Sequence, residues 1–198
     1  MNDEQAWIAQ AQRGSDEAFT RLVETYQTPV YNLCYRMLGE AEAAEDAAQE
    51  TFLRAYQNFA RYDCQRPFAT WLLSIAAHYC IDCLRRKRFV SFSLDDDSEM
   101  EVELPDRHAL DPEAETLRSE EHQRLHNLLQ SLDPTDRAAL VLRYWHECSE
   151  VEIAEVLSLT VSAVKSRLHR ARRALAKRWM EESPRTRAER MPYESPAF

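Results

Sequence analysis

The sequence predicts an all-α protein made of two small helical domains joined by an acidic, flexible linker. Only two glycines, Gly14 and Gly39, occur in 198 residues, while helix-favouring residues are abundant and apolar residues recur at helical spacing. Residues 91–119 carry ten acidic and two basic residues. This segment is interpreted as a tether between the domains, and the alternative is that it shields the basic helix of the second domain before a partner binds. The expected divisions are a helical domain over 1–90, the linker over 91–119, a second helical domain over 120–182 and a disordered tail over 183–198.

The composition excludes several functional classes. A phosphate-binding loop needs glycines where backbone N–H groups approach the ligand, and this chain has too few of them. No stretch approaches the roughly 18 apolar residues of a membrane span, and the N-terminus lacks the features of a signal peptide. Five cysteines, an odd number, do not make the paired framework of a secreted mini-protein. We therefore expect a soluble, cytoplasmic protein with reduced thiols and no membrane insertion, and we assign it no catalytic residue, cofactor or metal.

Three helices are predicted in the first domain. The first begins after the N-cap candidate Ser15 and bends or breaks near Pro29. The second begins soon after Gly39, and the third begins at Pro67, a favoured first-turn residue, and runs into the basic cluster 85–88. Each carries an apolar stripe, so that the three form one bundle: Phe19, Leu22, Val23 and Tyr26, then Ala48, Phe52, Ala55, Tyr56 and Phe59, then Trp71, Leu72, Ile75, Tyr79 and Leu84.

Local start signals mark the helices of the second domain. An amphipathic helix with Leu117, Leu125, Leu128, Leu129 and Leu132 comes first. An N-cap followed by a first-turn proline, Asp133-Pro134, then opens another helix. Ser149 and Glu152 have the spacing of a capping box, which opens a short helix to about residue 157. Thr160 or Ser162 caps the last helix, which runs to about residue 180.

The last two helices have the pattern of a DNA-reading helix-turn-helix. Seven cations and no acid lie between residues 165 and 178, in a chain of net charge −9. The second helix of such a motif places its N-terminal residues against base edges, while cations bind phosphates. The alternative is a solvated basic helix end, because cations near the C-terminus of a helix offset the negative end of its dipole. Seven cations are more than this offset needs. We assign base readout to Ser162, Ala163, Lys165, Ser166 and Arg167, and phosphate contacts to Arg170, Arg172 and Arg173.

A second candidate site combines the basic cluster 85–88 with the aromatic residues upstream of it. Aromatic stacking beside a cationic track is how proteins hold single-stranded nucleic acid. Several of these aromatics share a helical face, however, so core packing is the favoured interpretation for most of them. His78 and the Cys80-x-x-Cys83 pair invite a metal or redox interpretation, but one pair supplies too few ligands, and redox chemistry would need a sheet context. Packed thiols are the favoured interpretation.

Three stretches resemble one protein family. Residues 46–56, residues 68–76 with 82–86, and residues 152–154 with 164–172 are similar, in this order, to bacterial RNA polymerase sigma factors of the sigma-70 family. The two-domain plan is similar to the extracytoplasmic function (ECF) group, and the resemblance spans about residues 15–180. It implies that the first domain is sigma domain 2 and the second is sigma domain 4. Ser158 and Ser162 stand where the family often has glycine.

The resemblance also implies partners and site residues. It implies binding to core RNA polymerase through the beta-prime clamp helices and the beta flap, to promoter DNA both duplex and single-stranded, and to an anti-sigma factor. The helix that reads the minus-thirty-five element is the one proposed above from its charge. The polymerase-binding residues are Glu45, Asp46, Gln49, Glu50 and Leu53, and those that recognise and melt the minus-ten element are Tyr62, Arg66, Trp71, His78, Asp82, Arg85 and Arg86.

The expected function is therefore that of an ECF sigma factor, which binds core RNA polymerase and directs promoter-specific transcription initiation. The alternative is a helix-turn-helix regulator that acts on duplex operator DNA without being a polymerase subunit. The acidic helix at 45–53 and the aromatic-basic helix at 71–88 argue against this alternative.

Overall fold

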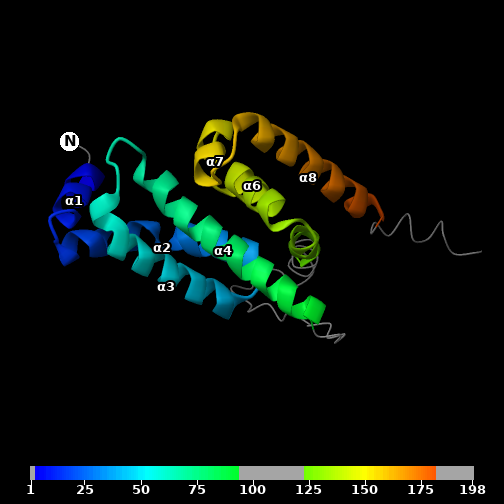
Figure 1. Cartoon of the computed structure of the whole chain (residues 1–198), viewed down its shortest axis with the longest axis horizontal. Coiled ribbons are helices and arrows are strands. Elements are labelled where there is room, and N and C mark those ends of the chain that lie inside the picture. Colours follow the sequence, from blue (N-terminus) through cyan, green and yellow to red (C-terminus); the bar gives the residue numbers. More distant parts are fainter. Residues whose placement is uncertain (1–2, 94–122, 182–198) are drawn as a thin grey trace, which may run out of the picture.

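The computed structural model describes residues 3–93 and 123–181, without the side chains of residues 89–93. Every regular element in these ranges is helical, as the sequence predicts (Figure 1). The helix α4 continues to Ser93, so the first three residues of the predicted linker are helical. The rest of that linker and the predicted tail lie outside the described residues. In chain order the elements are α1 (Asp3–Ala11), α2 (Asp16–Leu38), α3 (Ala41–Asn58), the 3-10 turn η1 (Phe59–Arg61), α4 (Phe68–Ser93), a helical stretch at 123–130, α6 (Pro134–Trp145), α7 (Glu150–Val156) and α8 (Val161–Glu181).

Helix α2 begins where the sequence predicts but does not break at its proline. The Ser15 side chain accepts a hydrogen bond from the backbone N–H of Ala18, and Asp16 opens the helix. Of the predicted bend or break near Pro29, the break is wrong, because α2 continues to Leu38. Several side chains after the proline, Val30 and Met37 among them, are fully buried. Their burial outweighs the roughly 3 kcal/mol that an internal proline costs a helix.

The first three long helices pack into one bundle. Helix α2 contacts both α3 and α4, and α3 contacts α4. The inner face of α3 is made of small residues, with Ala44, Ala47, Thr51 and Ala55 all completely buried. Small side chains allow close helix approach, and the Thr51 hydroxyl is satisfied by donating to the backbone carbonyl of Ala47 at 2.7 Å. The larger side chains of α3 therefore lie on the side of the helix that faces away from this core.

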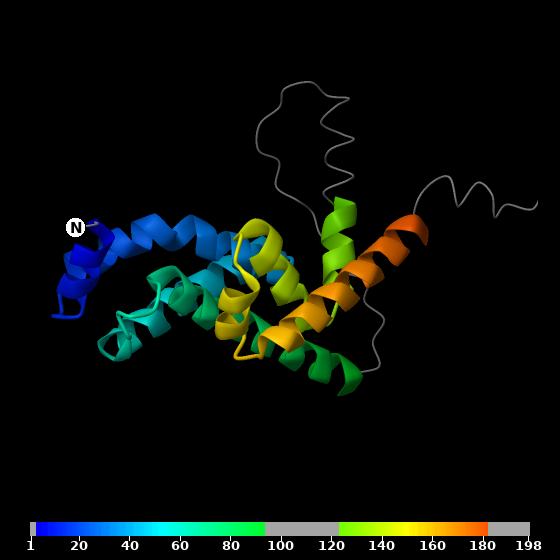
Figure 2. The same cartoon turned by 90° about the horizontal axis from the view of Figure 1, so that it is seen from above.

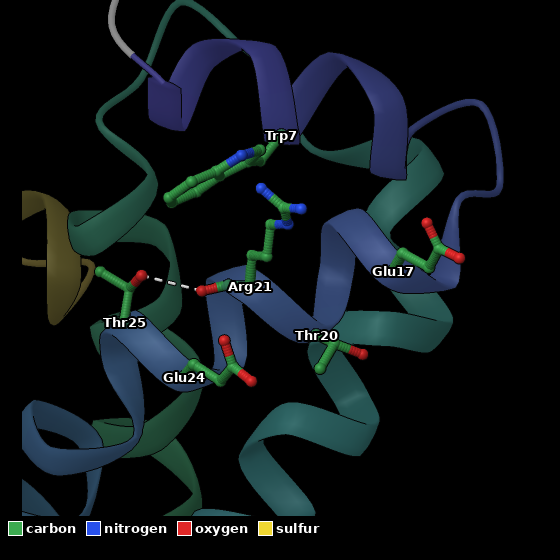
Figure 3. Close-up of a pocket in the computed structure, with 6 residues that line it drawn as sticks. All are labelled: Trp7, Glu17, Thr20, Arg21, Glu24 and Thr25. Carbon is green, nitrogen blue, oxygen red and sulfur yellow. Dashed lines mark hydrogen bonds between the residues drawn. The ribbon is translucent and has the colours of Figure 1, made fainter.

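A short N-terminal helix, α1, adds to this bundle and was not predicted. Ile8 is its only buried residue, so the sequence carries no apolar stripe to reveal it. Specific contacts hold it instead: the Tyr26 hydroxyl donates to the Glu4 carboxylate at 3.0 Å, and the Gln12 amide donates to the backbone carbonyl of Tyr62 at 2.9 Å. An open hollow of about 580 Å³ lies beside α1. The Arg21 guanidinium carbon lies 5.8 Å from the centre of the Trp7 ring, and Figure 3 shows both side chains in the lining of this hollow.

The second helical unit starts its helices with the predicted caps. The Asp133 carboxylate accepts from the backbone N–H of Thr135 at 3.0 Å. Ser149 and Glu152 form the full capping box, in which each side chain accepts a hydrogen bond from the other's backbone N–H. The Thr160 hydroxyl accepts from the N–H of Ala163 at 3.2 Å, so Thr160 caps α8. These are local signals, and local structure follows them.

The two units pack against each other. Helix α6 contacts both α2 and α4, and α7 contacts α4. One continuous apolar core runs through both units. Figures 1 and 2 show α6 and α7 lying over the first bundle, with α8 along their outer side. The two domains therefore form a single closed body within the described residues.

Candidate nucleic-acid and protein interfaces

Helix α8 separates a packing face from a basic face. Its buried residues, Val164, Leu168 and Ala171, follow helical spacing and pack toward α6 and α7. The opposite face carries most of the cations, and the whole helix has no acid before Glu181. Of the predicted DNA-contacting residues, Ala163 and Arg167 are partly buried and the others are exposed: Ser162, Lys165, Ser166, Arg170, Arg172 and Arg173.

The turn between α7 and α8 contains one residue in the left-handed conformation. Ser158 adopts a positive φ of 54°, a conformation in which glycine is more common. Leu157 and Leu159 flank it, and the N–H of Leu159 donates to the backbone carbonyl of Ala154 at 2.8 Å. The chain therefore makes the turn without glycine. Upstream, the hydrogen bonds from Ser149 lower the pKa of the Glu152 carboxyl, which keeps the capping box ionised.

Acidic residues of α6 and α7 engage part of the basic face. Arg167 Nη1 lies 2.6 Å from Asp136 Oδ1, and the two side chains are 28% and 14% exposed. Arg170 approaches the same carboxylate at 3.7 Å, and Lys165 approaches Glu150 at 3.6 Å. In this conformation Arg167 holds α8 on α6. The four cations farther along and the serines at the helix start are exposed, and the contacts of Lys177 with Glu181, of Arg172 with the Leu168 carbonyl and of Ser166 with the Ser162 carbonyl all stay within α8.

The predicted minus-ten residues divide between core and surface. Tyr62 is 5% exposed, its hydroxyl donates to the backbone carbonyl of Arg66, and its ring centre lies 4.9 Å from that of the half-buried Trp71. Phe59 and Phe68 complete this aromatic cluster. Burial raises the pKa of the Tyr62 hydroxyl to about 12, so it stays protonated and donates. The structure thus places Tyr62 in the core and Trp71 at its edge.

The remaining minus-ten residues on α4 form an exposed row. His78, Asp82, Arg85 and Arg86 are all exposed, and their spacing puts them on one face of the helix. His78 Nδ1 lies 2.8 Å from the backbone carbonyl of Ser74, and Arg86 Nε donates to the carbonyl of Asp82 at 3.3 Å. Two of the four side chains are therefore oriented along the helix. This row lies toward the C-terminal end of α4, away from the aromatic cluster at its N-terminal end.

Arg66, between η1 and α4, contacts the other unit. Its Nε lies 3.3 Å from Glu155 Oε1 on α7, and the two side chains are 59% and 35% exposed. A surface pair of this kind contributes little to stability, of order 0–1 kcal/mol. Its importance is positional, because it connects the predicted strand-binding loop to the first helix of the helix-turn-helix.

The outer face of α3 brings together the predicted polymerase-binding residues. Glu45, Asp46 and Gln49 are exposed, Glu50 is partly exposed, and Leu53 is 51% exposed among them. Glu50 pairs with Arg54 at 2.7 Å. A leucine and an exposed tyrosine, Tyr56, beside carboxylates form a mixed acidic and apolar surface, which suits a protein partner better than a nucleic acid.

Comparison with known proteins assigns the family. Residues 22–90 match Sigma-70 region 2, and residues 122–175 match Sigma-70 region 4. The ECF RNA polymerase sigma factor SigW of Bacillus subtilis is 36% identical over 181 residues, which cover 86% of this chain and 93% of SigW. The chain belongs to the sigma-70 family, as an ECF sigma factor. The RNA polymerase sigma-H factor of Pseudomonas aeruginosa is 33% identical over 181 residues, 89% of this chain and 94% of that one.

Solved structures agree with this assignment. CnrH, in its complex with the cytosolic domain of CnrY, is 27% identical to this ECF sigma factor at a TM-score of 0.68, covering 92% of this chain and all of CnrH. RpoE from Bartonella quintana, in complex with the anti-sigma factor NepR, shares the fold at a TM-score of 0.65 and 17% identity, covering 83% of this chain and 98% of that one.

The expected function is confirmed at the level of the family. An ECF sigma factor binds core RNA polymerase and directs promoter-specific transcription initiation, so a regulator acting without polymerase is not favoured. No helix in the ranges 3–93 and 123–181 is long and apolar enough to cross a membrane.

The cysteines of this ECF sigma factor are free thiols in different environments. Cys34, Cys80 and Cys148 are buried, Cys83 is half-buried and Cys64 is exposed. A hydrogen bond with Cys34, reinforced by burial, raises the pKa of Cys80 far above its ordinary value. Burial raises the pKa of Cys148 to about 11. The Cys80-x-x-Cys83 pair therefore splits between core and helix surface, as packed thiols would.

Sequence reasoning missed one residue that the structure makes prominent. Arg137 of α6 is 3% exposed and bonds across to the first unit. A lone arginine in an amphipathic pattern is normally a solvated residue. The signal was the unbroken apolar run at 138–142 directly after it, since a helix that is apolar all round is buried all round.

Proposed function

We propose that this ECF sigma factor uses three separate surfaces, one for each step of initiation. The outer face of α3 docks on the beta-prime clamp helices, the row on α4 together with the loop at 59–66 holds the opened minus-ten strand, and α8 reads the minus-thirty-five duplex. The beta flap is the expected partner of the second unit. The protein performs no catalysis of its own and acts in the cytoplasm with core polymerase.

The observation that carries this proposal is the start of α8. Its first two turns expose Ser162, Lys165 and Ser166, while the packing face on Val164 and Leu168 fixes the helix against α6 and α7. Recognition helices place their N-terminal residues against base edges and use later cations on phosphates. Base preference therefore belongs to 162–166, and sequence-independent affinity to Arg170, Arg172 and Arg173.

A matched pair of lysines tests this division. Lys165 and Lys177 are exposed, with side chains 63% and 77% accessible, and they lie about 18 Å apart along α8. Lys165→Ala should relax the preference for the upstream element by about 1–3 kcal/mol, measured as competition between cognate and scrambled duplexes. Lys177→Ala removes the same charge and should weaken all duplexes alike. Equal, sequence-independent losses from both variants would overturn the base-reading role of Lys165.

Arg167 has a conditional part in this proposal. Its guanidinium is engaged by Asp136 in the closed body. Direct base contact by Arg167 therefore requires that pair to separate on DNA, and otherwise Arg167 positions α8 without reading sequence.

For the minus-ten element, we propose that Arg85 and Arg86 bind the strand's phosphates and that His78 and Asp82 face its bases. Both arginines are exposed, beside two further cations at residues 87 and 88. Tyr62 acts by positioning the loop from the core, and Trp71 offers the edge of its ring for stacking. Arg85→Ala should reduce open-complex formation on a closed promoter more than on a pre-melted one, measured with 2-aminopurine in the minus-ten region. An equal loss on both templates would assign Arg85 to core polymerase binding instead.

An anti-sigma partner is also part of the proposal. RpoE was solved in complex with the anti-sigma factor NepR, and CnrH, which is 27% identical to this chain, was solved in complex with the cytosolic domain of CnrY. A pull-down from the native host, using the full chain as bait, should recover a small regulatory protein that blocks core polymerase binding. Recovery of core polymerase subunits without an inhibitor would remove this partner.

A further inference from the structure

The loop at 59–66, which leads into α4, is held from the N-terminal end of the chain. Residues 63–67 are all exposed, between the buried aromatics Tyr62 and Phe68. An exposed segment has little apolar surface to bury, so hydrogen bonds must order it. Gln12, the residue directly after α1, supplies two of them from 50 and 52 positions away along the chain. Figure 1 shows α1 beside this loop.

Both ends of the Gln12 amide are used. Its Nε2 donates to the backbone carbonyl of Tyr62 at 2.9 Å, and its Oε1 accepts from the Cys64 thiol at 3.1 Å. A reversed amide would set its oxygen against the carbonyl oxygen, so the two partners together fix one orientation of the side chain. The backbone N–H of Gln12 donates to the carbonyl of Ile8 at the end of α1. The side chain therefore leaves α1 and spans two positions of the loop.

The other hydrogen bonds of this exposed stretch are internal to the loop. The Asp63 carboxylate accepts from the N–H of Gln65, and the Asp63 carbonyl accepts from the N–H of Arg66, each at 3.0 Å. These bonds shape the turn but do not tie it to the rest of the protein. Within 3–93 and 123–181, Gln12 is the only residue outside the loop that forms a hydrogen bond with residues 62–65.

Helix α1 is itself fixed to the bundle, so it can serve as an anchor. At its start the Glu4 carboxylate accepts from the Tyr26 hydroxyl of α2 at 3.0 Å, and Ile8 is buried near its end. Burial raises the pKa of Tyr26, so this hydroxyl stays protonated and donates. Helix α1 also packs along α2. Gln12 therefore extends to the loop from an element that is held at both ends.

The order of the loop affects DNA binding only if the loop contacts DNA, so the inference rests on the proposed function. There the loop and the row on α4 hold the opened minus-ten strand. A flexible loop loses conformational freedom when it binds, and this loss subtracts from affinity. A loop that is already ordered presents its exposed groups in one arrangement, which favours the base sequence that fits this arrangement over others.

We propose that Gln12 is a positioning residue for minus-ten recognition: by binding the Tyr62 carbonyl and the Cys64 thiol together, it holds the loop in the form that favours one base sequence. This pair of hydrogen bonds is called the Gln12 clamp. Gln12 acts through the loop and not by touching DNA. Helix α1, which carries none of the predicted DNA-binding or polymerase-binding residues, contributes in this way to promoter choice.

Two substitutions, each with a matched control, test the Gln12 clamp in the full-length protein. Gln12→Met keeps the length of the side chain but removes both hydrogen bonds, and Gln10→Met makes the same change at an exposed glutamine of α1. Cys64→Ala removes the thiol donor, whereas Cys64→Ser keeps a donor at the same position. Gln12→Met and Cys64→Ala should therefore act alike, while Gln10→Met and Cys64→Ser should resemble the wild type.

The first measurement is amide hydrogen exchange, which reports on the loop without DNA. The amides of Gln65 and Arg66 should exchange about threefold to tenfold faster in Gln12→Met, the range that corresponds to the net contribution of one hydrogen bond. Amides of α2 should keep their wild-type rates. Unchanged loop rates would overturn the clamp. If the α2 amides speed up equally, the Cys64 pair decides, because it leaves α1 intact, and equal loop rates in Cys64→Ala and Cys64→Ser would then overturn it.

The second measurement is base preference, taken with each variant bound to core polymerase on forked promoter duplexes whose opened minus-ten strand is randomised. The wild type should enrich one motif, and Gln12→Met should enrich the same motif about threefold to tenfold less. Preference for the upstream element, at the distant helix α8, should not change, whereas general unfolding would lower both preferences.

The two measurements together separate the clamp from the proposed function. Faster loop exchange in Gln12→Met with an unchanged minus-ten preference would overturn the positioning role. A wild type that enriches no minus-ten motif would instead overturn the proposed function of the loop, and the exchange rates would still decide whether Gln12 orders it.

Discussion

The pair between Arg167 and Asp136 offers a quantitative test of how α8 is held. Its 2.6 Å separation and partial burial make it a charge-assisted hydrogen bond rather than a loose surface pair. Such bonds contribute about 1.5–3 kcal/mol, but exposure screens the pair and Asp133, at 3.7 Å from Arg167, remains as a substitute partner. We therefore expect a coupling energy of about 1–2 kcal/mol between the two side chains.

A double-mutant cycle measures this coupling directly. Urea unfolding would be followed for the wild type, Asp136→Asn, Arg167→Met and the double variant. The two single changes should each destabilise the protein, and their effects should not add. A coupling below about 0.5 kcal/mol, within the error of additivity, would show that the contact does not fasten α8 to α6.

The same substitution has a consequence for DNA binding. Asp136→Asn removes the carboxylate that Arg167 and Arg170 both approach, so it should free cationic charge on α8. Duplex affinity should rise, and the slope of log affinity against log salt should steepen by up to about 1 for each additional phosphate contact. An unchanged slope would mean that neither arginine reaches the DNA after release.

Three further predictions concern other parts of the molecule. Asp46→Arg combined with Glu50→Arg should abolish most binding to core polymerase while leaving upstream-duplex binding unchanged, and unaltered core affinity in a pull-down would misplace the α3 interface. Ser149→Ala should cost about 1 kcal/mol in urea unfolding at pH 7. Because the folded pKa of Glu152 is lowered, this advantage of the wild type is present above the ordinary value of 4.5 and should vanish as pH falls through the folded value, and a pH-independent difference would contradict this. Cys64, the exposed thiol, should react first with a chromogenic thiol reagent, and faster labelling of any buried thiol would show that the core opens.

Local signals in this sequence predict local structure well. The caps at Ser15, Asp133, Ser149 and Thr160 all form. Each joins a side chain to a backbone N–H only two or three residues away, so its formation does not depend on the rest of the fold. Pro29 shows the limit of such reasoning. Its effect on α2 depends on what the following turns bury, which only the packed bundle decides.

Contacts between distant residues were beyond prediction from the sequence. Arg137 and Met37 are 100 residues apart, and Arg167 and Asp136 are 31 apart. A cation in a helical pattern gives no indication of whether it faces water, DNA or a carbonyl, so Arg167 was assigned to base readout on spacing alone. The aromatic cluster around Tyr62 was equally ambiguous, since stacking platforms and cores use the same side chains.

The central claim is that one chain supplies both promoter contacts to core polymerase, and transcription from randomised promoters tests it most directly. The purified protein would be added to core RNA polymerase on a library randomised across both elements, and the transcribed templates sequenced. The account predicts enrichment of two short motifs at a fixed separation, with the upstream motif lost in Lys165→Ala and kept in Lys177→Ala. Enrichment of a single motif, or transcription no different from core polymerase alone, would contradict it.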